Sequence, residues 1–150
     1  MSQDDSTRER LLARFPVFAQ LPPAQLDALL AAAPARRAPA GSVLFEPHMP
    51  CEGFPLVLDG SVRVAKTSPE GREIVLYRVS PGEACILSGG CLLGQTGYAA
   101  RGVAESDVTL LRIPPAMFQE LILQQPPFRR FVFDMYGARL AEVMELLEEV

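Results

Sequence analysis

The sequence predicts a mainly β protein, an antiparallel barrel or double-stranded β-helix (jelly roll) with flanking helices. Two observations predict this class. Short runs rich in β-branched and large apolar residues, separated by turn residues, fill the middle of the chain. Apolar residues at helical spacing fill the two ends. A chain of 150 residues is long enough for one domain with a sizeable core.

Residues 1–36 are predicted to form a helical segment in two pieces. The first helix ends at Pro16, because proline removes a backbone donor and cannot continue a helix. The second helix begins near Pro22 and ends at Pro34. The residues that indicate these helices are leucines at helical spacing: Leu11, Leu12, Leu26, Leu29 and Leu30.

Residues 37–113 are predicted to form the β-barrel. Strands are expected in SVLFE (42–46), in the hairpin FPLVLDGSVRVAK (54–66), in EIVLYRV (73–79) and in DVTLLRI (107–113). Asp59-Gly60 and the segment 68–71 have the composition of turns between strands. Residues 82–101 lie between the last two of these strands and are glycine-rich without alternation. This segment is therefore the natural place for a functional loop.

Residues 114–150 are predicted to form a short helix and then one long helix. Proline lies near the start of the short helix, and Pro126-Pro127 ends it. Apolar residues of the long helix recur at alternating spacings of three and four, which is a heptad seam. We expect this seam to form a homodimer, and the alternative is packing against the protein's own barrel. Its residues are Phe133, Tyr136, Leu140, Val143, Leu147 and Val150.

Composition narrows the functional classes. The formal net charge is −4 and the isoelectric point is near 5.0, which argues against this chain wrapping nucleic acid. The N-terminus lacks the apolar core of a signal peptide. No run approaches the roughly 18 to 20 apolar residues that a membrane-spanning helix needs. We therefore expect a cytoplasmic protein without a membrane partner.

The order of these motifs resembles the effector domain of Crp/Fnr-type transcription regulators. The resemblance runs from about Phe15 to Val150. It rests on G-S-V-R-V at 60–64, S-P-G-E at 80–83, and a strand plus short helix before the long helix. It implies a cyclic-nucleotide-binding-type jelly roll that dimerises through its long helix. It also implies a helix-turn-helix domain beyond residue 150, so that contacts with DNA and RNA polymerase belong to the full-length protein.

The resemblance also bears on the effector. Cyclic-AMP-binding members have a cassette that opens with Gly-Glu and closes with Arg-Ser/Thr-Ala, whose arginine pairs with the phosphate. Gly82 and Glu83 match the opening, but the closing motif occurs nowhere in this chain. A buried phosphate needs such a cation. Cyclic nucleotide binding is therefore the alternative interpretation, with Tyr98 and Arg101 as further pocket candidates.

Three cysteines suggest a second kind of signal. An odd number does not make a disulfide framework. Cys85 and Cys91 are six positions apart around a Ser-Gly-Gly turn and could approach each other. They predict a thiol switch that responds to oxidants or reactive sulfur, with Cys51 as a third candidate. The alternative is that these thiols are small buried hydrophobes.

Haem-binding members of the family use an axial histidine or cysteine, so His48 and Cys51 are candidates for a haem or metal ligand. The iron–sulfur sensors hold their cluster mostly through N-terminal cysteines, which this chain lacks. An enzyme is not expected, because the single histidine offers no triad and a metal-binding cupin needs several histidines.

The predicted function is a sensory and dimerisation domain that controls DNA binding. The signal is a small effector or a redox or reactive-sulfur species sensed at residues 82–101. The alternatives are a cyclic-nucleotide-binding regulatory module and a haem- or metal-dependent gas sensor. No single cofactor follows from the sequence, and the candidates are a cyclic nucleotide, haem or a metal.

Overall fold

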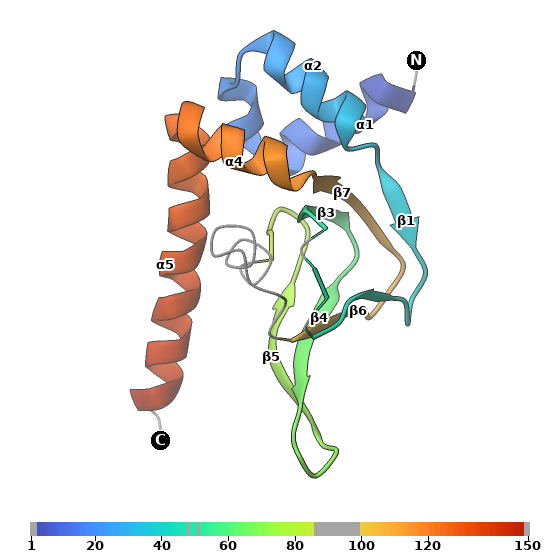
Figure 1. Ribbon diagram of the computed structural model, residues 1–150, viewed down its shortest axis with the longest axis vertical. Helices are drawn as coiled ribbons and strands as arrows, with labels where there is room; N and C mark the ends of the chain where they lie inside the picture. Colours follow the sequence, from blue (N-terminus) through green and yellow to red (C-terminus); the bar gives the residue numbers. More distant parts are fainter. Residues whose placement is uncertain (1–2, 48, 51, 86–99, 149–150) are drawn as a thin grey trace.

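The computed structural model describes residues 3–47, 49–50, 52–85 and 100–148. Helices pack above one end of a β-barrel, and the last helix runs along its side (Figure 1). The order and type of the elements confirm the predicted fold class. The elements are α1 (Gln3–Arg14), η1 (Pro16–Gln20), α2 (Pro23–Ala32), β1 (Arg36–Ala38), β2 (Val43–Phe45), β3 (Phe54–Asp59), β4 (Val62–Thr67), β5 (Glu73–Val79), β6 (Arg101–Ala104), β7 (Val108–Ile113), α4 (Pro115–Gln124) and α5 (Pro126–Glu148).

The strands form two antiparallel sheets. One has the order β1-β7-β3 and the other the order β2-β6-β4-β5. Strand β3 is buried almost throughout, because both faces of its sheet are covered. Leu56 and Leu58 face the helices, whereas Val57 faces the barrel interior with Leu110. A strand covered on both faces has a continuous apolar sequence, and this is why FPLVL shows no alternation.

An aromatic cluster joins the helices to this sheet. Phe128, at the beginning of α5, is fully buried and is the centre of the cluster. Its ring centroid lies 5.8 Å from that of Phe118 on α4, 5.9 Å from that of Phe18 on η1, and 6.4 Å from that of Phe54 on β3. Rings at these separations add roughly 0.5–1.5 kcal/mol per pair beyond burial. The cluster therefore fixes where α5 begins.

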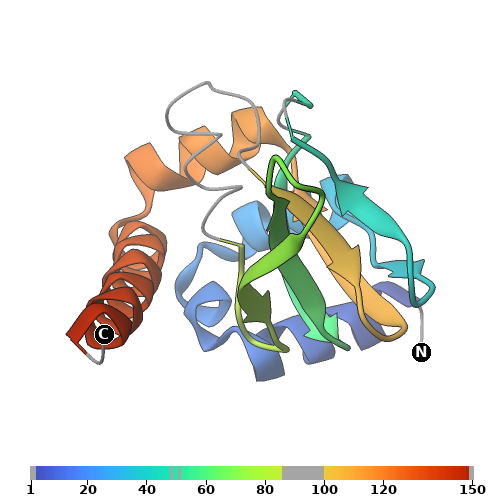
Figure 2. The same cartoon turned by 90° about the horizontal axis from the view of Figure 1, so that it is seen from below.

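Helix α5 then leaves the helical layer and lies beside the barrel in both views (Figures 1 and 2). The helices α2, α4 and α5 each begin with proline in the first turn, where its missing N–H costs nothing. None of the helices that the structure describes is long and apolar enough to cross a membrane.

Two strands, β1 and β6, lie outside the strand ranges that the sequence predicted. Strand β1 consists of Arg36, Arg37 and Ala38, which have no apolar alternation, and only its pairing with β7 defines it. Strand β6 pairs with both β4 and β2, and it begins at Arg101. Its Gly102 is required by packing, because a Cβ there would lie 2.4 Å from the Phe45 ring.

Candidate functional site

The segment Ser80–Glu83, which begins the predicted functional loop, is a tight turn. The Glu83 N–H donates to the Ser80 carbonyl oxygen at 2.9 Å. Pro81 occupies the second position and Gly82 the third, where φ is +86°. Proline followed by a residue of positive φ is the pattern of a type II turn, which favours glycine at that position. The sequence SPGE thus builds its own turn.

Two sets of contacts fix this turn. The Gly82 N–H donates to the Val57 carbonyl oxygen at 3.0 Å, and Ala84 forms a bridge with Leu56, so β3 holds the backbone. The Glu83 carboxylate folds back, and its Oε1 accepts the Ser80 N–H at 2.8 Å. One oxygen of Glu83 is therefore used within the turn, and its other oxygen faces outward.

Arg139 of α5 meets that second oxygen. Its Nη2 lies 3.5 Å from Glu83 Oε2 and donates to the Arg78 carbonyl oxygen at 2.9 Å. Its Nη1 donates to Glu142 Oε2 at 3.1 Å. The guanidinium also lies over the Tyr77 ring, 4.7 Å from the centroid. Only 15% of the Arg139 side chain is exposed, so this contact is a built junction between α5 and the barrel.

Cys85 lies in the same junction. It is 3% exposed, and its Sγ is 3.2 Å from the Tyr77 hydroxyl. Tyr136 of α5 lies near enough to interact with it electrostatically. Burial raises the pKa of Tyr136 to about 12, and the charge of the neighbouring Cys85 adds to the shift. We call these five residues the docking cluster: Tyr77, Glu83, Cys85, Tyr136 and Arg139.

Among the described residues, a small apolar cavity lies in the barrel behind the cluster. The cavity there has a volume of about 10 Å³, which is close to the minimum for one water molecule. Its lining residues carry no charge: Leu44, Phe45, Pro55, Val57, Val62, Val79, Cys85 and Leu110. A ligand of nucleotide size does not fit the cavity that these described residues line.

Arg101 is the second cation of interest. It begins β6, opposite Ala65 of β4. Its Nε is buried and has no hydrogen-bond partner among the described residues. A buried guanidinium nitrogen without an acceptor is costly, and an anionic ligand would supply one. Arg101 thus keeps the chemistry of an anion-binding residue.

Several predicted site residues lie outside the described residues. They are Cys91 and Tyr98 in the loop, and His48 and Cys51 before β3, so the thiol pair and the haem or metal ligands stay predictions. Within the described part of the chain, no three histidine, cysteine, aspartate or glutamate residues gather as a metal site.

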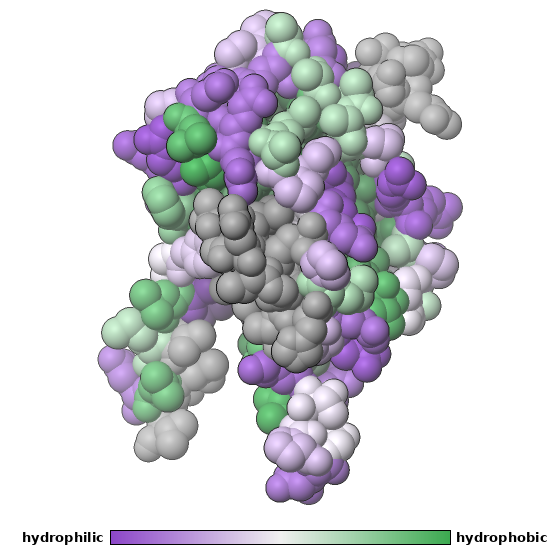
Figure 3. Space-filling view, in the orientation of Figure 1, coloured by the Kyte–Doolittle hydropathy of each residue, from purple (hydrophilic) through white to green (hydrophobic). Residues whose placement is uncertain are grey.

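The residues of the predicted heptad seam differ in their surroundings, since some are exposed and one packs against the core. Phe133, Leu140 and Leu147 are 57%, 61% and 70% exposed, and Met144 extends the same apolar surface. Tyr136, in contrast, is half-buried against the protein's own core. Val150 lies outside the described residues, as does the side chain of Val143. Hydrophobic residues are visible on the outer part of α5 in Figure 3.

Sequence reasoning missed Arg139 and Tyr77. In the sequence, Tyr77 is not distinguished from the other large apolar residues of the predicted strand 73–79. The sequence does contain an indication for Arg139. It is the only cationic residue between Phe131 and Val150, a segment with five acidic residues. A single cation in such a segment is a candidate for a specific pairing.

Comparison with known proteins agrees with this geometry. Residues 35–125 match the cyclic nucleotide-binding domain family. A comparison with curated protein sequences found no match. Among solved structures, a protein described as a transcriptional regulator of the Crp/Fnr family from Eubacterium rectale is 28% identical, with a TM-score of 0.81. The alignment covers 91% of this chain and 63% of that one.

Two other structures extend the comparison. The catabolite activator protein of Thermus thermophilus is 28% identical with a TM-score of 0.70, over 89% of this chain and 62% of that one. The sensor domain of the transcriptional regulator DNR from Pseudomonas aeruginosa is 20% identical and shares the fold, with a TM-score of 0.77 over 97% of this chain and 95% of that one. This chain thus spans less than two thirds of the length of the first two proteins. The family match, the barrel and the long helix beside it lead to one conclusion: the chain belongs to the cyclic nucleotide-binding domain family, and its structural neighbours are Crp/Fnr-type transcription regulators.

Proposed function

We propose that this chain is the sensory and dimerisation domain of a Crp/Fnr-type transcription regulator. In this proposal a small effector received between residues 82 and 101 controls the position of α5, and DNA binding belongs to the full-length protein. The observation that carries the proposal is the contact of Arg139 on α5 with the Glu83 carboxylate in the turn that opens the loop. The contact joins the sensing segment to the proposed dimer helix.

The strength of this contact suits a switch. The Glu83 side chain is 47% exposed and the two charged atoms are 3.5 Å apart, so the ion pair contributes no more than about 1 kcal/mol. A ligand with micromolar affinity has a binding free energy of roughly −8 kcal/mol. An effector that takes Glu83 as its own hydrogen-bond acceptor therefore outweighs the pair and frees Arg139. The remaining Arg139 contacts then decide how far α5 moves.

The apolar surface of α5 supports the dimerisation part. Leu140, Met144 and Leu147 are large, exposed and at helical spacing. A second copy of the same helix covers such a stripe with a matching stripe, as in a two-fold coiled-coil contact. Any change in the angle of α5 then alters the relation between the two subunits.

Hydrogen exchange of the 150-residue chain tests the coupling. We expect Glu83→Gln and Arg139→Gln each to speed amide exchange across residues 136–148, because both variants remove the charge pair. Glu145→Gln is the control, since Glu145 is an exposed carboxylate on the same helix. Unchanged exchange in both pair variants, or equal acceleration in the control, would contradict the coupling.

Cyclic nucleotide binding is the second candidate, and it is favoured by the buried Nε of Arg101, which has no hydrogen-bond partner within the described part of the chain. Calorimetry with cyclic AMP is the direct measurement. If the nucleotide binds through this guanidinium, Arg101→Gln should weaken binding about tenfold or more. Arg72→Gln, an exposed arginine in the β4–β5 turn, should leave binding unchanged. The absence of binding heat in the unmodified chain would remove this candidate.

The thiol switch remains a prediction, and the burial of Cys85 adds a condition to it. An oxidant should reach Cys85 only after the docking cluster opens, because the residue is buried and its sulfur contacts the Tyr77 hydroxyl. Arg139→Gln should therefore speed the modification of Cys85 by a polysulfide, as measured by intact mass and peptide mapping. An unreactive Cys85 in both proteins would mean that its thiol serves as a core residue.

A further inference from the structure

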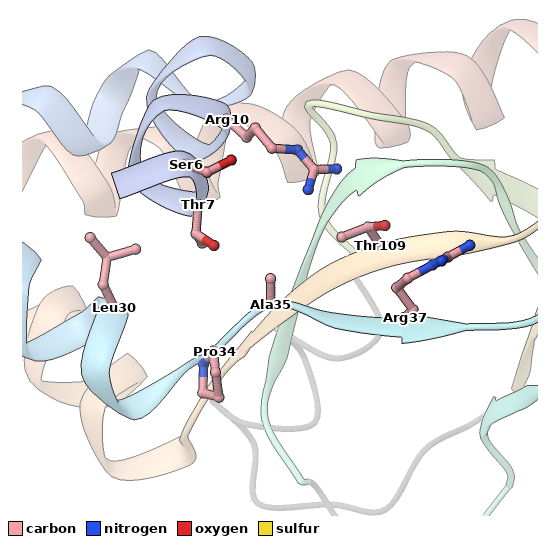
Figure 4. Close-up of a pocket in the computed structure, with 8 residues that line it drawn as sticks. All are labelled: Ser6, Thr7, Arg10, Leu30, Pro34, Ala35, Arg37 and Thr109. Carbon is pink, nitrogen blue, oxygen red and sulfur yellow. The ribbon is translucent and has the colours of Figure 1, made fainter. Parts of the chain in front are cut away.

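A second cavity lies away from the docking cluster, between the helical layer and the three-stranded sheet. It has a volume of about 300 Å³, at the lower end of the range for small-molecule sites. Helices and strands both contribute to its wall, as Figure 4 shows. The lining residues are Ser6, Thr7 and Arg10 from α1, Leu30 from α2, Pro34 and Ala35 after it, Arg37 from β1 and Thr109 from β7.

The sheet explains why this end of the layer is polar. On the helix-facing side of β7, Ile113 and Leu111 belong to the core, and Thr109 comes next. Thr109 pairs with Arg37 on one side and with Asp59 on the other. Directly paired residues point to the same face of a sheet. Arg37, Thr109 and Asp59 therefore form a polar row across three strands, where the apolar core ends.

Arginine is in excess around this row. Arg10 binds the Asp59 carboxylate, and Arg14 also approaches it at 3.5 Å. Arg37 lies 3.8 Å from Asp107, and both of these side chains are mostly exposed, so solvent screens that pair. Three guanidinium groups thus face two carboxylates. The excess positive charge stands out in a chain whose net charge is −4.

The donors of the cavity suit a tetrahedral anion. Ser6, Thr7 and Thr109 supply three hydroxyl groups, and Arg10 and Arg37 supply guanidinium N–H groups from opposite sides. A phosphate group has several acceptor oxygens and favours such charge-assisted donors. Leu30, Pro34 and Ala35 form an apolar wall beside them. Such a wall contacts the carbon portion of a ligand.

We propose that this cavity is a binding site for a small organic phosphate, separate from the effector segment at residues 82–101. Arg37 and Thr109 hold the phosphate, and the wall formed by Leu30, Pro34 and Ala35 contacts the organic group. A bound ligand bridges α1 to the β1–β7 pair. The proposal does not depend on the identity of the effector that the loop receives.

Titration of the ¹⁵N-labelled chain with phenyl phosphate tests the site by nuclear magnetic resonance. We expect saturable shifts of amides in residues 6–10, 34–37 and 109. Arg37→Gln should weaken binding about tenfold, the typical loss for one charge-assisted hydrogen bond. Thr109→Val, which keeps the shape and removes the hydroxyl, should weaken it less. Inorganic phosphate should bind more weakly than phenyl phosphate, because it lacks the apolar contact.

Arg36→Gln is the matched control. Arg36 precedes Arg37 on β1 and pairs with Leu110, so it belongs to the opposite face of the sheet. Its loss should leave the affinity unchanged. Equal weakening by Arg36→Gln would mean that phosphate is attracted only by the general charge of the strand, and the site would be rejected. Non-saturable shifts in the unmodified chain would also reject it, and equal binding of inorganic phosphate would remove the organic part of the proposal.

Discussion

The two halves of α5 have opposite surroundings although they form one helix. In the first half, Phe128 and Val132 are fully buried in the aromatic cluster. In the second half, Leu140 and Leu147 are mostly exposed. Arg139 lies between the two halves and contacts the barrel through the Arg78 carbonyl oxygen. Phe128 and Val132 therefore stabilise the fold, whereas Leu140 and Leu147 are available to a partner.

The largest expected effect comes from the first half. Phe128→Ala should lower the free energy of unfolding by about 3–5 kcal/mol, because it removes a ring that contacts several others and leaves a cavity. Phe133 lies on the same helix but is 57% exposed. Phe133→Ala should therefore lower the free energy of unfolding of the monomer by less than about 1 kcal/mol. Urea unfolding at low protein concentration measures both. Similar losses in the two variants would contradict the difference in burial between the two rings.

The second half should show its effect in association. We expect the double variant Leu140→Ala/Leu147→Ala to weaken a homodimer at least tenfold, or about 1.4 kcal/mol, because truncated apolar contacts at an interface cost at least this much. Leu123→Ala is the control, since Leu123 is 76% exposed on α4. Sedimentation equilibrium of the three proteins is the measurement. A monomeric parent chain, or an unchanged dimer in the double variant, would remove the dimer assignment.

A smaller effect concerns the junction between the halves. The pKa of Tyr136 is raised to about 12, so the folded state keeps its proton above pH 10 while the unfolded state loses it. Stability should therefore be constant below about pH 10 and fall as the pH rises toward 12. The Tyr136 contribution should be about 1 kcal/mol, because the half-exposed ring is partly screened by solvent.

Tyr136→Phe should remove this part of the pH dependence, since phenylalanine has no proton to lose. Urea unfolding of both proteins at pH 9, 10.5 and 11.5 gives the comparison. Parallel curves for the two proteins would mean that Tyr136 ionises as freely in the folded state as in the unfolded state.

The sequence was most informative where local rules decide the structure. The turn at Ser80–Glu83 follows from proline and glycine in consecutive positions, and the ends of the helices follow from their prolines. Strand β1 could not be found in this way, because Arg36 and Arg37 become a strand only when β7 lies beside them. The extended conformation of β1 therefore depends on its pairing with β7.

The candidate site was predictable only in part. Gly82, Glu83 and Arg101 were identified from a motif, and the structure gives each a specific environment. The link between Glu83 and Arg139 joins residues far apart in the chain, and no local pattern contains it. Likewise, the seam pattern included Tyr136 with Leu140, although only the structure separates the residue that faces the barrel from the one that faces solvent.

The pairing of β3 with β7 also sets the order in which the chain can fold. Apart from the isolated bridge between Leu56 and Ala84, β3 pairs with β7, where Leu56 lies opposite Leu111, so the buried strand must wait for a segment near the end of the barrel sequence. Contacts of such sequence separation slow folding, since the intervening loop must close first. During synthesis at about 5 to 20 residues per second, β3 stays unpaired for some seconds. Its apolar faces are then the natural target of a chaperone.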